Sequence, residues 1–446
     1  MSPDRGDAPK PPPAARAQRA AQAATSDGAD ARWQASRLLA APHRLGFFGG
    51  ALMFAASALW WFVVLLARAA QWPLPWAVSP GLAHAIVMTF GFMPMFFCGF
   101  LLTAGTKWLA QPEVRASALL PVVGPALAGW VLYLIGVHAS VSLAASGLTA
   151  VAAGWSAFTL RWWQLVRTSR ARDRTHPRSI GVACGIGAFA LWAAAAGVAA
   201  QREDVARAAV QLGLWGFVAL VFVTAAHRMI PFFSDGGIAR LDVRRPAWLL
   251  WVFAATLAVQ VLFGIAGALG VQPSPAASAM RAALEAPSAL LLAALALRWA
   301  WLPALRQHLR QRLLAMMYVG FVWFALALAL ATASDALAAA SGGALSLGVA
   351  PLHAMTMGFF ASIVLAMVSR VACGHSGRSL VADGFLWCAF WLLQGAVVLR
   401  VASAAWPAAP QALLVAAALG WALVAGGWAL RYGRWFGLPR ADGRPG

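Results

Sequence analysis

The sequence predicts an all-α protein, a polytopic membrane bundle of about twelve transmembrane helices. Of its 446 residues, 61% are hydrophobic and only 11% are charged, whereas soluble domains average about 25% charged residues. Its apolar runs have the length of roughly 17 to 25 residues that a helix needs to cross a bilayer. These runs are rich in Ala, Leu and Trp and lack the alternation of strands, which favours helices over a β-barrel.

Twelve apolar runs follow one another along the chain. They lie near 46–70, 82–104, 116–138, 141–164, 179–200, 206–227, 247–270, 278–300, 312–334, 346–369, 380–403 and 410–431. Residues 1–40 contain no such run and are rich in Ala, Pro and Arg, so we expect a disordered basic tail. The predicted domains are therefore this tail, a twelve-helix membrane domain at 41–432, and a short C-terminal tail at 433–446.

The distribution of Arg and Lys predicts the orientation. With the N-terminus inside, only five of the 34 basic residues fall in outer segments, which leaves 29 on the inner side. The five are Arg68, Arg202, Arg207, Arg281 and Arg400. Because basic residues accumulate in cytoplasmic loops, both termini are predicted to be cytoplasmic. Topology also explains the net charge of +20, so we expect no nucleic-acid partner.

Several classes of function lack their motifs. The four cysteines form no CxxC or CxxCH motif, which argues against iron–sulfur clusters and covalently attached haem. No Walker A loop is present, so this chain alone is not expected to use ATP. No carboxylate is expected at mid-membrane, and Glu285 is expected to pair locally with Arg281, four residues earlier. This pattern argues against a proton pump or proton-coupled transporter.

Three histidines lie near the predicted outer face: His84, His138 and His353. Spans 2 and 10 both contain His-Ala-x-x-Met, which places Met88 one turn after His84 and Met357 one turn after His353. Two imidazoles from different helices suit a bis-histidine haem b, and thioethers favour Cu(I). The alternative is that the histidines bond to backbone groups and the methionines fill gaps in the core.

The histidines near the predicted inner face are each accompanied by arginine. His43 precedes span 1, His227 ends span 6 before Arg228, and His375 follows span 10 between Arg370 and Arg378. Guanidinium groups bind carboxylates such as haem propionates in a bidentate manner. The positive-inside pattern explains these arginines equally well. The remaining two histidines, His176 and His308, lie in basic loops, where we expect them to be solvated.

Three segments carry a resemblance to a known family. They are GFLLTA at 99–104, R-x-I-P-x-F at 228–233, and SRVACGHSGR at 369–378. Together with the twelve-span layout, they resemble the NnrS family of bacterial inner-membrane proteins, over about 43–432. In span 2 the chain departs from the family pattern at Ile86 and Val87, where many relatives have a histidine and an acid.

The resemblance implies a haem-containing and copper-containing protein linked to denitrification and to defence against nitric oxide. It points to His84, His353, His375, Arg370 and Arg378 as site residues. An enzyme, a sensor and a metal carrier are all compatible with these residues. The competing interpretations are a metal-free solute transporter and a haem–copper oxidase, although the latter would need an adjacent pair of histidines that this sequence lacks.

Overall fold

The computed structural model describes residues 32–235, 247–301, 310–406 and 408–444, and in these ranges the chain folds into helices without strands. Twelve of the described helical segments are long and apolar enough to cross a membrane. The predicted number of spans is therefore confirmed. Residues 1–31 of the predicted tail lie outside the described residues, and a short 3-10 helix, η1 (Ala35–Leu39), precedes the first span.

The twelve spans are numbered here in chain order. The first six are α2 (Pro42–Ala69); α3 (Pro80–Phe90) with α4 (Met93–Phe100), η2 (Leu101–Gly105) and α5 (Thr106–Trp108); η3 (Ala116–Leu119) with α6 (Leu120–Ala139); α7 (Val141–Thr168); α8 (Thr175–Ala199); and α9 (Glu203–Gln211) with η4 (Leu212–Ala219) and α10 (Leu220–Asp235). The last six are α11 (Ala247–Ala268); α12 (Pro275–Trp301); α14 (Arg312–Ala340); α15 (Ala350–His353) with η5 (Ala354–Phe360) and α16 (Ala361–His375); α17 (Gly384–Ala405); and α18 (Gln411–Phe436).

Local sequence explains where several of these helices begin. Proline occupies the first turn of α2, α3 and α15, where the missing N–H group costs no intrahelical hydrogen bond. The Asp383 side chain accepts a hydrogen bond from the Leu386 amide at 3.0 Å and so caps α17. The tenth span continues six residues beyond its predicted end at 369, so His375 is the last residue of α16. It does not lie in a turn after the helix, as the sequence had suggested.

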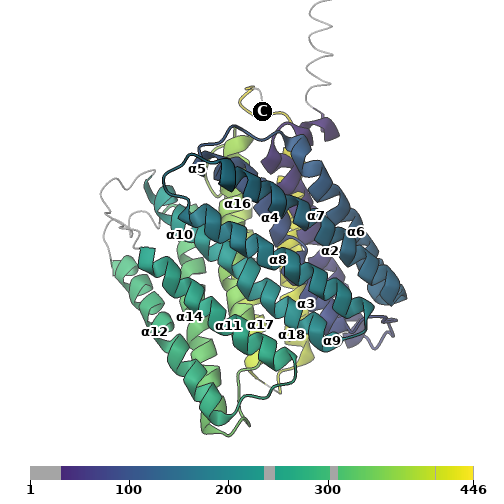
Figure 1. The fold of residues 1–446 in the computed structure, drawn as a ribbon, viewed down its shortest axis with the longest axis vertical. Coiled ribbons are helices and arrows are strands. Elements are labelled where there is room, and N and C mark those ends of the chain that lie inside the picture. The colour runs from purple at the N-terminus through teal and green to yellow at the C-terminus, as the bar shows by residue number, and fades with distance from the viewer. Residues whose placement is uncertain (1–31, 236–246, 302–309, 407, 445–446) are drawn as a thin grey trace, which may run out of the picture.

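The start of the described chain and the C-terminus lie at the same end of the bundle (Figure 1). We call this the terminal end and the other the opposite end. His43 and His375 lie at the terminal end, whereas His84 and His353 lie at the opposite end, because each span reverses the direction of the chain. That the terminal end faces the cytoplasm stays a prediction from the distribution of Arg and Lys.

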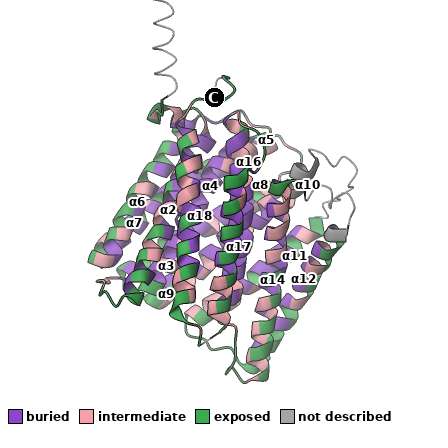
Figure 2. Cartoon of the chain, turned by 180° about the vertical axis from the view of Figure 1, so that it is seen from behind, coloured by how far each residue is buried: buried purple, intermediate pink, exposed green. Residues whose placement is uncertain are grey.

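Spans 2, 6 and 10 form the centre of the bundle. Between 72% and 83% of the residues in their apolar segments are buried, against at most 50% in the other nine described spans. Figure 2 shows buried residues gathered between the helices and exposed residues on the outward sides of α6 and α17. Each central span also contains a π-helix, namely η2, η4 or η5. Because π-helical turns often occur at functional sites, the centre is the natural place to look for one.

Span 2 is also broken in the middle. Its first helix, α3, ends at Phe90, and α4 begins at Met93, so Gly91 and Phe92 interrupt the regular helix. Gly124 and Pro125, by contrast, lie inside the continuous helix formed by η3 and α6. A broken central helix frees backbone groups within the membrane, which bundles tolerate where protein buries them.

Small residues allow α6 and α7 to approach closely, as is common where membrane helices associate. A Cβ atom added to Gly136 would lie 2.3 Å from the backbone nitrogen of Ala144, whereas one added to Gly124 would meet nothing within 4 Å. We expect Gly136→Ala to lower the free energy of unfolding by about 1–3 kcal/mol, because the two backbones must separate. The matched control Gly124→Ala lies on the same helix. Thermal unfolding of both purified variants in detergent tests this, and equal midpoints would contradict it.

Candidate functional site

The opposite end of the bundle brings together a pair of histidines from spans 2 and 10. His84 of α3 and His353 of α15 interact electrostatically, and both also interact with Arg400 of α17. The ring of Trp61 from α2 stacks on His84 with a centroid separation of 3.9 Å. The sequence predicted a shared centre for this pair, and the structure places both imidazoles at the same end of the bundle within electrostatic range of each other. That they meet at a common centre stays a prediction.

The hydrogen bonding of His353 determines which of its nitrogens is available. Its Nδ1 lies 2.9 Å from the carbonyl oxygen of Val349. A carbonyl only accepts, so Nδ1 carries the proton, and Nε2 of the neutral ring keeps its lone pair. Histidines that bind metals are commonly held in this way, with the second nitrogen donating to a backbone carbonyl. His353 is only 9% exposed.

His84 has a buried ring nitrogen with no hydrogen-bond partner. The atom is Nδ1, which is enclosed by the surrounding helices. Leaving a buried polar atom unpaired costs roughly 1–3 kcal/mol, so such atoms often indicate a ligand or a functional role. Met88 and Met357 are half-buried and pack against the hydrophobic core on the helices that carry His84 and His353.

His138, the third histidine at this end, has a structural role. Trp60 Nε1 donates a hydrogen bond to His138 Nε2 at 3.0 Å, and His138 Nδ1 donates to the carbonyl oxygen of Pro75 at 2.9 Å. Both ring nitrogens are therefore occupied. His138 ties α6 to α2 and to the loop between spans 1 and 2, and it has no nitrogen left for a ligand.

At the terminal end, His43 of α2 and His375 of α16 form a second pair. Their ring centroids are 4.0 Å apart, and the ring planes are tilted by 37°. Axial imidazoles on one haem iron have ring centres about 6 Å apart, because each metal–nitrogen bond is about 2 Å long. These two rings, as placed, therefore do not fit on opposite sides of a porphyrin. His43 is 4% exposed, and its Nδ1 has no hydrogen-bond partner.

Basic groups surround this second pair. Arg44 donates hydrogen bonds to the carbonyl oxygens of Phe436 and Leu438, both at 3.0 Å, and Arg440 donates to the carbonyl of His375 at 3.1 Å. Lys107 also interacts electrostatically with His375, and Glu113 is the one acid that does so among the described residues. This end is therefore a positive environment that would attract an anionic group.

The predicted arginine ligands have aromatic neighbours. Arg378 lies over the ring of Trp435 at 4.3 Å, and burial lowers the pKa of its guanidinium. Arg228 lies over the ring of Trp108 at 4.9 Å. Arg370 is half-buried near the end of α16. Cation–π contacts of this kind stabilise a guanidinium in a partly dry environment.

A third pair of histidines was not expected. Nε2 of His176 lies 3.0 Å from Nδ1 of His227, so His176 of α8 contacts His227 of α10. The prediction that His176 is solvated in a loop was wrong, because α8 begins at Thr175 and turns this ring towards span 6. His308 lies outside the described residues.

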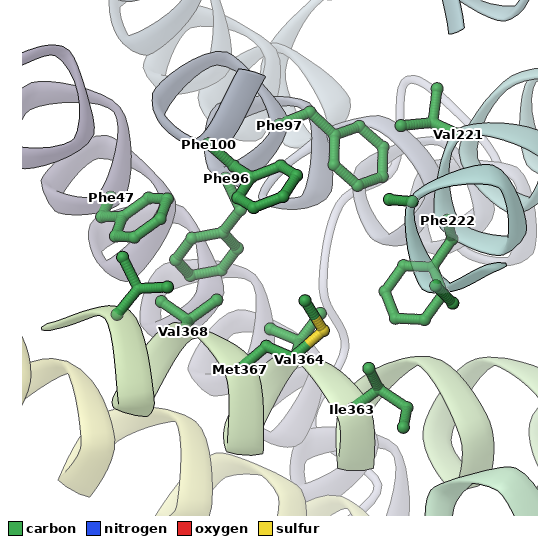
Figure 3. A pocket seen from close by; sticks show the side chains of 13 residues that line it. Phe47, Phe96, Phe97, Phe100, Val221, Phe222, Ile363, Val364, Met367 and Val368 are labelled. Carbon is green, nitrogen blue, oxygen red and sulfur yellow. The ribbon is translucent and has the colours of Figure 1, made fainter. Parts of the chain in front are cut away.

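An apolar cavity of about 60 Å³ lies between spans 1, 2, 6 and 10. Figure 3 shows the phenylalanine rings of span 2 on one side and Val364, Met367 and Val368 of span 10 facing them. Phe47 and Val371 both line the cavity. Phe47 lies four residues after His43, and Val371 lies four residues before His375. The cavity is therefore one helical turn away from the terminal-end pair. It is large enough for more than one water molecule, but its apolar lining should keep it dry.

A polar cavity of about 220 Å³ opens near the opposite end, among spans 6, 7, 8, 9 and 10. Arg281 Nε donates to Glu285 Oε1 at 2.9 Å and also lies 3.3 Å from Asp335 Oδ2. The predicted pairing of Arg281 with Glu285 is confirmed. The expectation of no carboxylate at mid-membrane was wrong, because Glu285 is fully buried ten residues, or about 15 Å, into α12.

Sequence reasoning missed this polar cluster because its members come from three helices. Gln260 of α11 completes the cluster. Its side-chain nitrogen donates a hydrogen bond to Glu285 Oε1 at 2.9 Å, and its side-chain oxygen accepts one from Arg281 at 2.6 Å. A glutamine in the middle of an otherwise apolar span was the available signal. Among the described residues, no group of three or more His, Cys, Asp or Glu side chains lies close enough together to hold a metal ion.

Comparison with protein families gives a match over nearly the whole chain. The model of the NnrS family, described as "NnrS protein", matches residues 37–440. The chain belongs to the NnrS family. No curated protein matches it. The region shared with the family contains all twelve spans, the three histidine pairs and both cavities.

The structural role of His138 can be tested by a double-mutant cycle. We expect His138→Ala and Trp60→Phe each to lower the free energy of unfolding by about 1 kcal/mol, because each leaves a half-buried hydrogen-bonding group unpaired. The double variant should lose less than the sum of the two, since both remove the same hydrogen bond. Chemical denaturation in detergent measures this, and strictly additive losses would show that the bond does not contribute.

Proposed function

We propose that this member of the NnrS family is a metal-binding protein of the bacterial inner membrane that handles nitric oxide. The observation that carries the proposal is the pair formed by His84 and His353. One ring has its Nδ1 proton committed to a carbonyl, and the other has a buried nitrogen without a partner. Imidazoles arranged in this way are suited to coordinate a metal through the free nitrogens.

The donor atoms around this pair suit copper or haem iron. Met88 and Met357 add thioether sulfur on the same two helices, and soft sulfur with imidazole favours Cu(I). When bound there, either metal would supply a redox-active centre able to bind a diatomic gas. The protein would contribute the orientation of both rings, through the Val349 carbonyl and the stacked ring of Trp61. Arg400 would favour negative charge near the site.

The apolar cavity, which lies towards the terminal end and apart from the His84–His353 pair, supports nitric oxide as the ligand that is handled. Nitric oxide is small and nearly apolar, so it partitions into lipid and into dry cavities without losing strong hydrogen bonds to water. The 60 Å³ space between spans 1, 2, 6 and 10 has only aromatic, aliphatic and Met side chains in its lining. A polar substrate would gain nothing there, whereas a diatomic gas would be held by dispersion contacts.

A second candidate function, solute transport without a metal, draws support from two observations. Span 2 is interrupted at Gly91 and Phe92, and a polar cavity of about 220 Å³ lies at the opposite end. Broken helices and polar cavities within the membrane are typical of secondary transporters. The two candidates differ in metal content, which the next experiment measures.

Metal analysis and visible spectra of the purified protein test the proposed site. We expect His84→Ala and His353→Ala to lose most of the bound metal, because each removes one of the two imidazoles. A Soret band in the unmodified protein would identify haem, and copper without such a band would identify a copper site. His138→Gln is the matched control and should keep the metal. A colourless, metal-free protein would overturn the proposal and favour transport.

Filling the apolar cavity tests the gas site. We expect Ala225→Leu to reduce the binding of xenon, used as an apolar probe of similar size, because the larger side chain occupies the space. The control Ala128→Leu makes the same change at an exposed position of α6. Xenon NMR of the protein in detergent measures the difference. Unchanged xenon binding in Ala225→Leu would show that the cavity is not the site.

A further inference from the structure

The polar cavity at the opposite end contains an excess of negative charge. Two carboxylates, Glu285 and Asp335, contact the single guanidinium of Arg281. The neighbouring helix α11 contributes only the neutral amide of Gln260 to this cluster. Among the described residues, Arg281 and Asp335 are the charged groups that interact with Glu285. With both acids ionised, the cluster would carry one uncompensated negative charge.

Burial makes that charge expensive. The side chain of Glu285 is fully buried, and those of Arg281 and Asp335 are only 24% and 16% exposed. An unpaired charge removed from water costs several kcal/mol or more, and proteins usually avoid this cost by neutralising the group. A further cation is therefore required, and the proton is the smallest one available.

The hydrogen bonds leave room for a proton. Glu285 Oε1 accepts from Arg281 and from Gln260, whereas Glu285 Oε2 is buried and has no hydrogen-bond partner in the part of the chain that the structure describes. Asp335 Oδ2 also has no hydrogen bond, although it lies 3.3 Å from Arg281 Nε. Each acid thus has an oxygen on which a proton can be placed without breaking an existing hydrogen bond.

The cavity borders the cluster through Arg281 and Asp335, whereas Glu285 lies behind them and does not line it. Arg281 and Asp335 line it together with Gln211, Gln260 and Ser334, and its volume of about 220 Å³ can hold several water molecules on this polar lining. Of the two acids, Asp335 is partly exposed and Glu285 is fully buried, so Asp335 is the acid closer to solvent. Water can therefore bring a proton to the pair from the opposite end of the bundle.

We propose that Glu285 and Asp335 together hold one proton, exchanged with water at the opposite end of the bundle through this cavity. The step takes one proton from water and converts one carboxylate of the pair into a carboxylic acid, with no transfer of electrons. The cluster then carries no net charge. The site is independent of the proposed metal site, although Val349, which lines the cavity, accepts the Nδ1 hydrogen bond of His353.

Infrared spectroscopy of the unmodified protein in lipid films tests the proposal directly. At neutral pH we expect the carbonyl-stretch band of one protonated carboxylic acid, which shifts on exchange into D₂O and disappears at high pH. Absence of this band would overturn the proposal without any variant having to fold. A band that disappears when Na⁺ or Ca²⁺ is added at constant pH would also overturn it, because a metal ion would then be the bound cation.

Three variants distinguish a shared proton from one held by a single acid. We expect Glu285→Gln and Asp335→Asn each to remove the band. In either variant the one remaining carboxylate balances the charge of Arg281, so it no longer needs a proton. Survival of the band in either variant would contradict sharing. The control is Asp204→Asn, since Asp204 lies at the same end and pairs with Arg202 at 2.7 Å. This variant should keep the band.

Discussion

Every polar side chain inside this bundle must find a partner within the protein, because the surrounding lipid offers none. Two tryptophans meet this requirement with hydrogen bonds between spans: buried Trp428 donates to Ser369 at 2.8 Å, and half-buried Trp323 donates to Gln394 at 2.7 Å. Gln394 in turn donates to Ser362 at 3.0 Å. These bonds attach spans 9, 11 and 12 to span 10 and hold it in the centre. Against this background the few buried atoms without partners, such as Nδ1 of His84, stand out as functional candidates.

The fold could be predicted from the sequence because its signal is local. Each span is a run of apolar residues long enough to cross a bilayer, so twelve helices could be counted without knowing their neighbours. Which spans lie at the centre could not be predicted in this way. Spans 2, 6 and 10 are no more hydrophobic than the others, with mean hydropathies of 2.1, 2.0 and 1.7, and only packing reveals their burial.

The candidate site was partly predictable for the same reason. The repeated His-Ala-x-x-Met pattern identified His84 and His353 because each motif lies within one span, and the structure places both at the same end of the bundle within electrostatic range. The pairing of His43 with His375 joins spans 1 and 10, which are far apart in the chain, and that of His176 with His227 joins side chains 51 residues apart. Nothing in a single sequence fixes such distances. The cluster of Arg281, Glu285 and Asp335 was predicted only in part. The spacing of Arg281 and Glu285 predicted their ion pair, but the second acid, Asp335, comes from another helix.

The last residues of the chain close over its first span. Arg440, whose hydrogen bonds to Asp442 help to lower the pKa of that carboxyl to about 2, reaches the backbone of His375, and the amide of Ala441 donates to the carbonyl of Ser376 at 2.8 Å. Arg44, next to His43, donates to the backbone of Phe436 and Leu438. This arrangement sets an order of assembly. During synthesis the first span must wait in the membrane until the segment at 436–441 has been made, so the environment of His43 is completed only after span 12 has been synthesised.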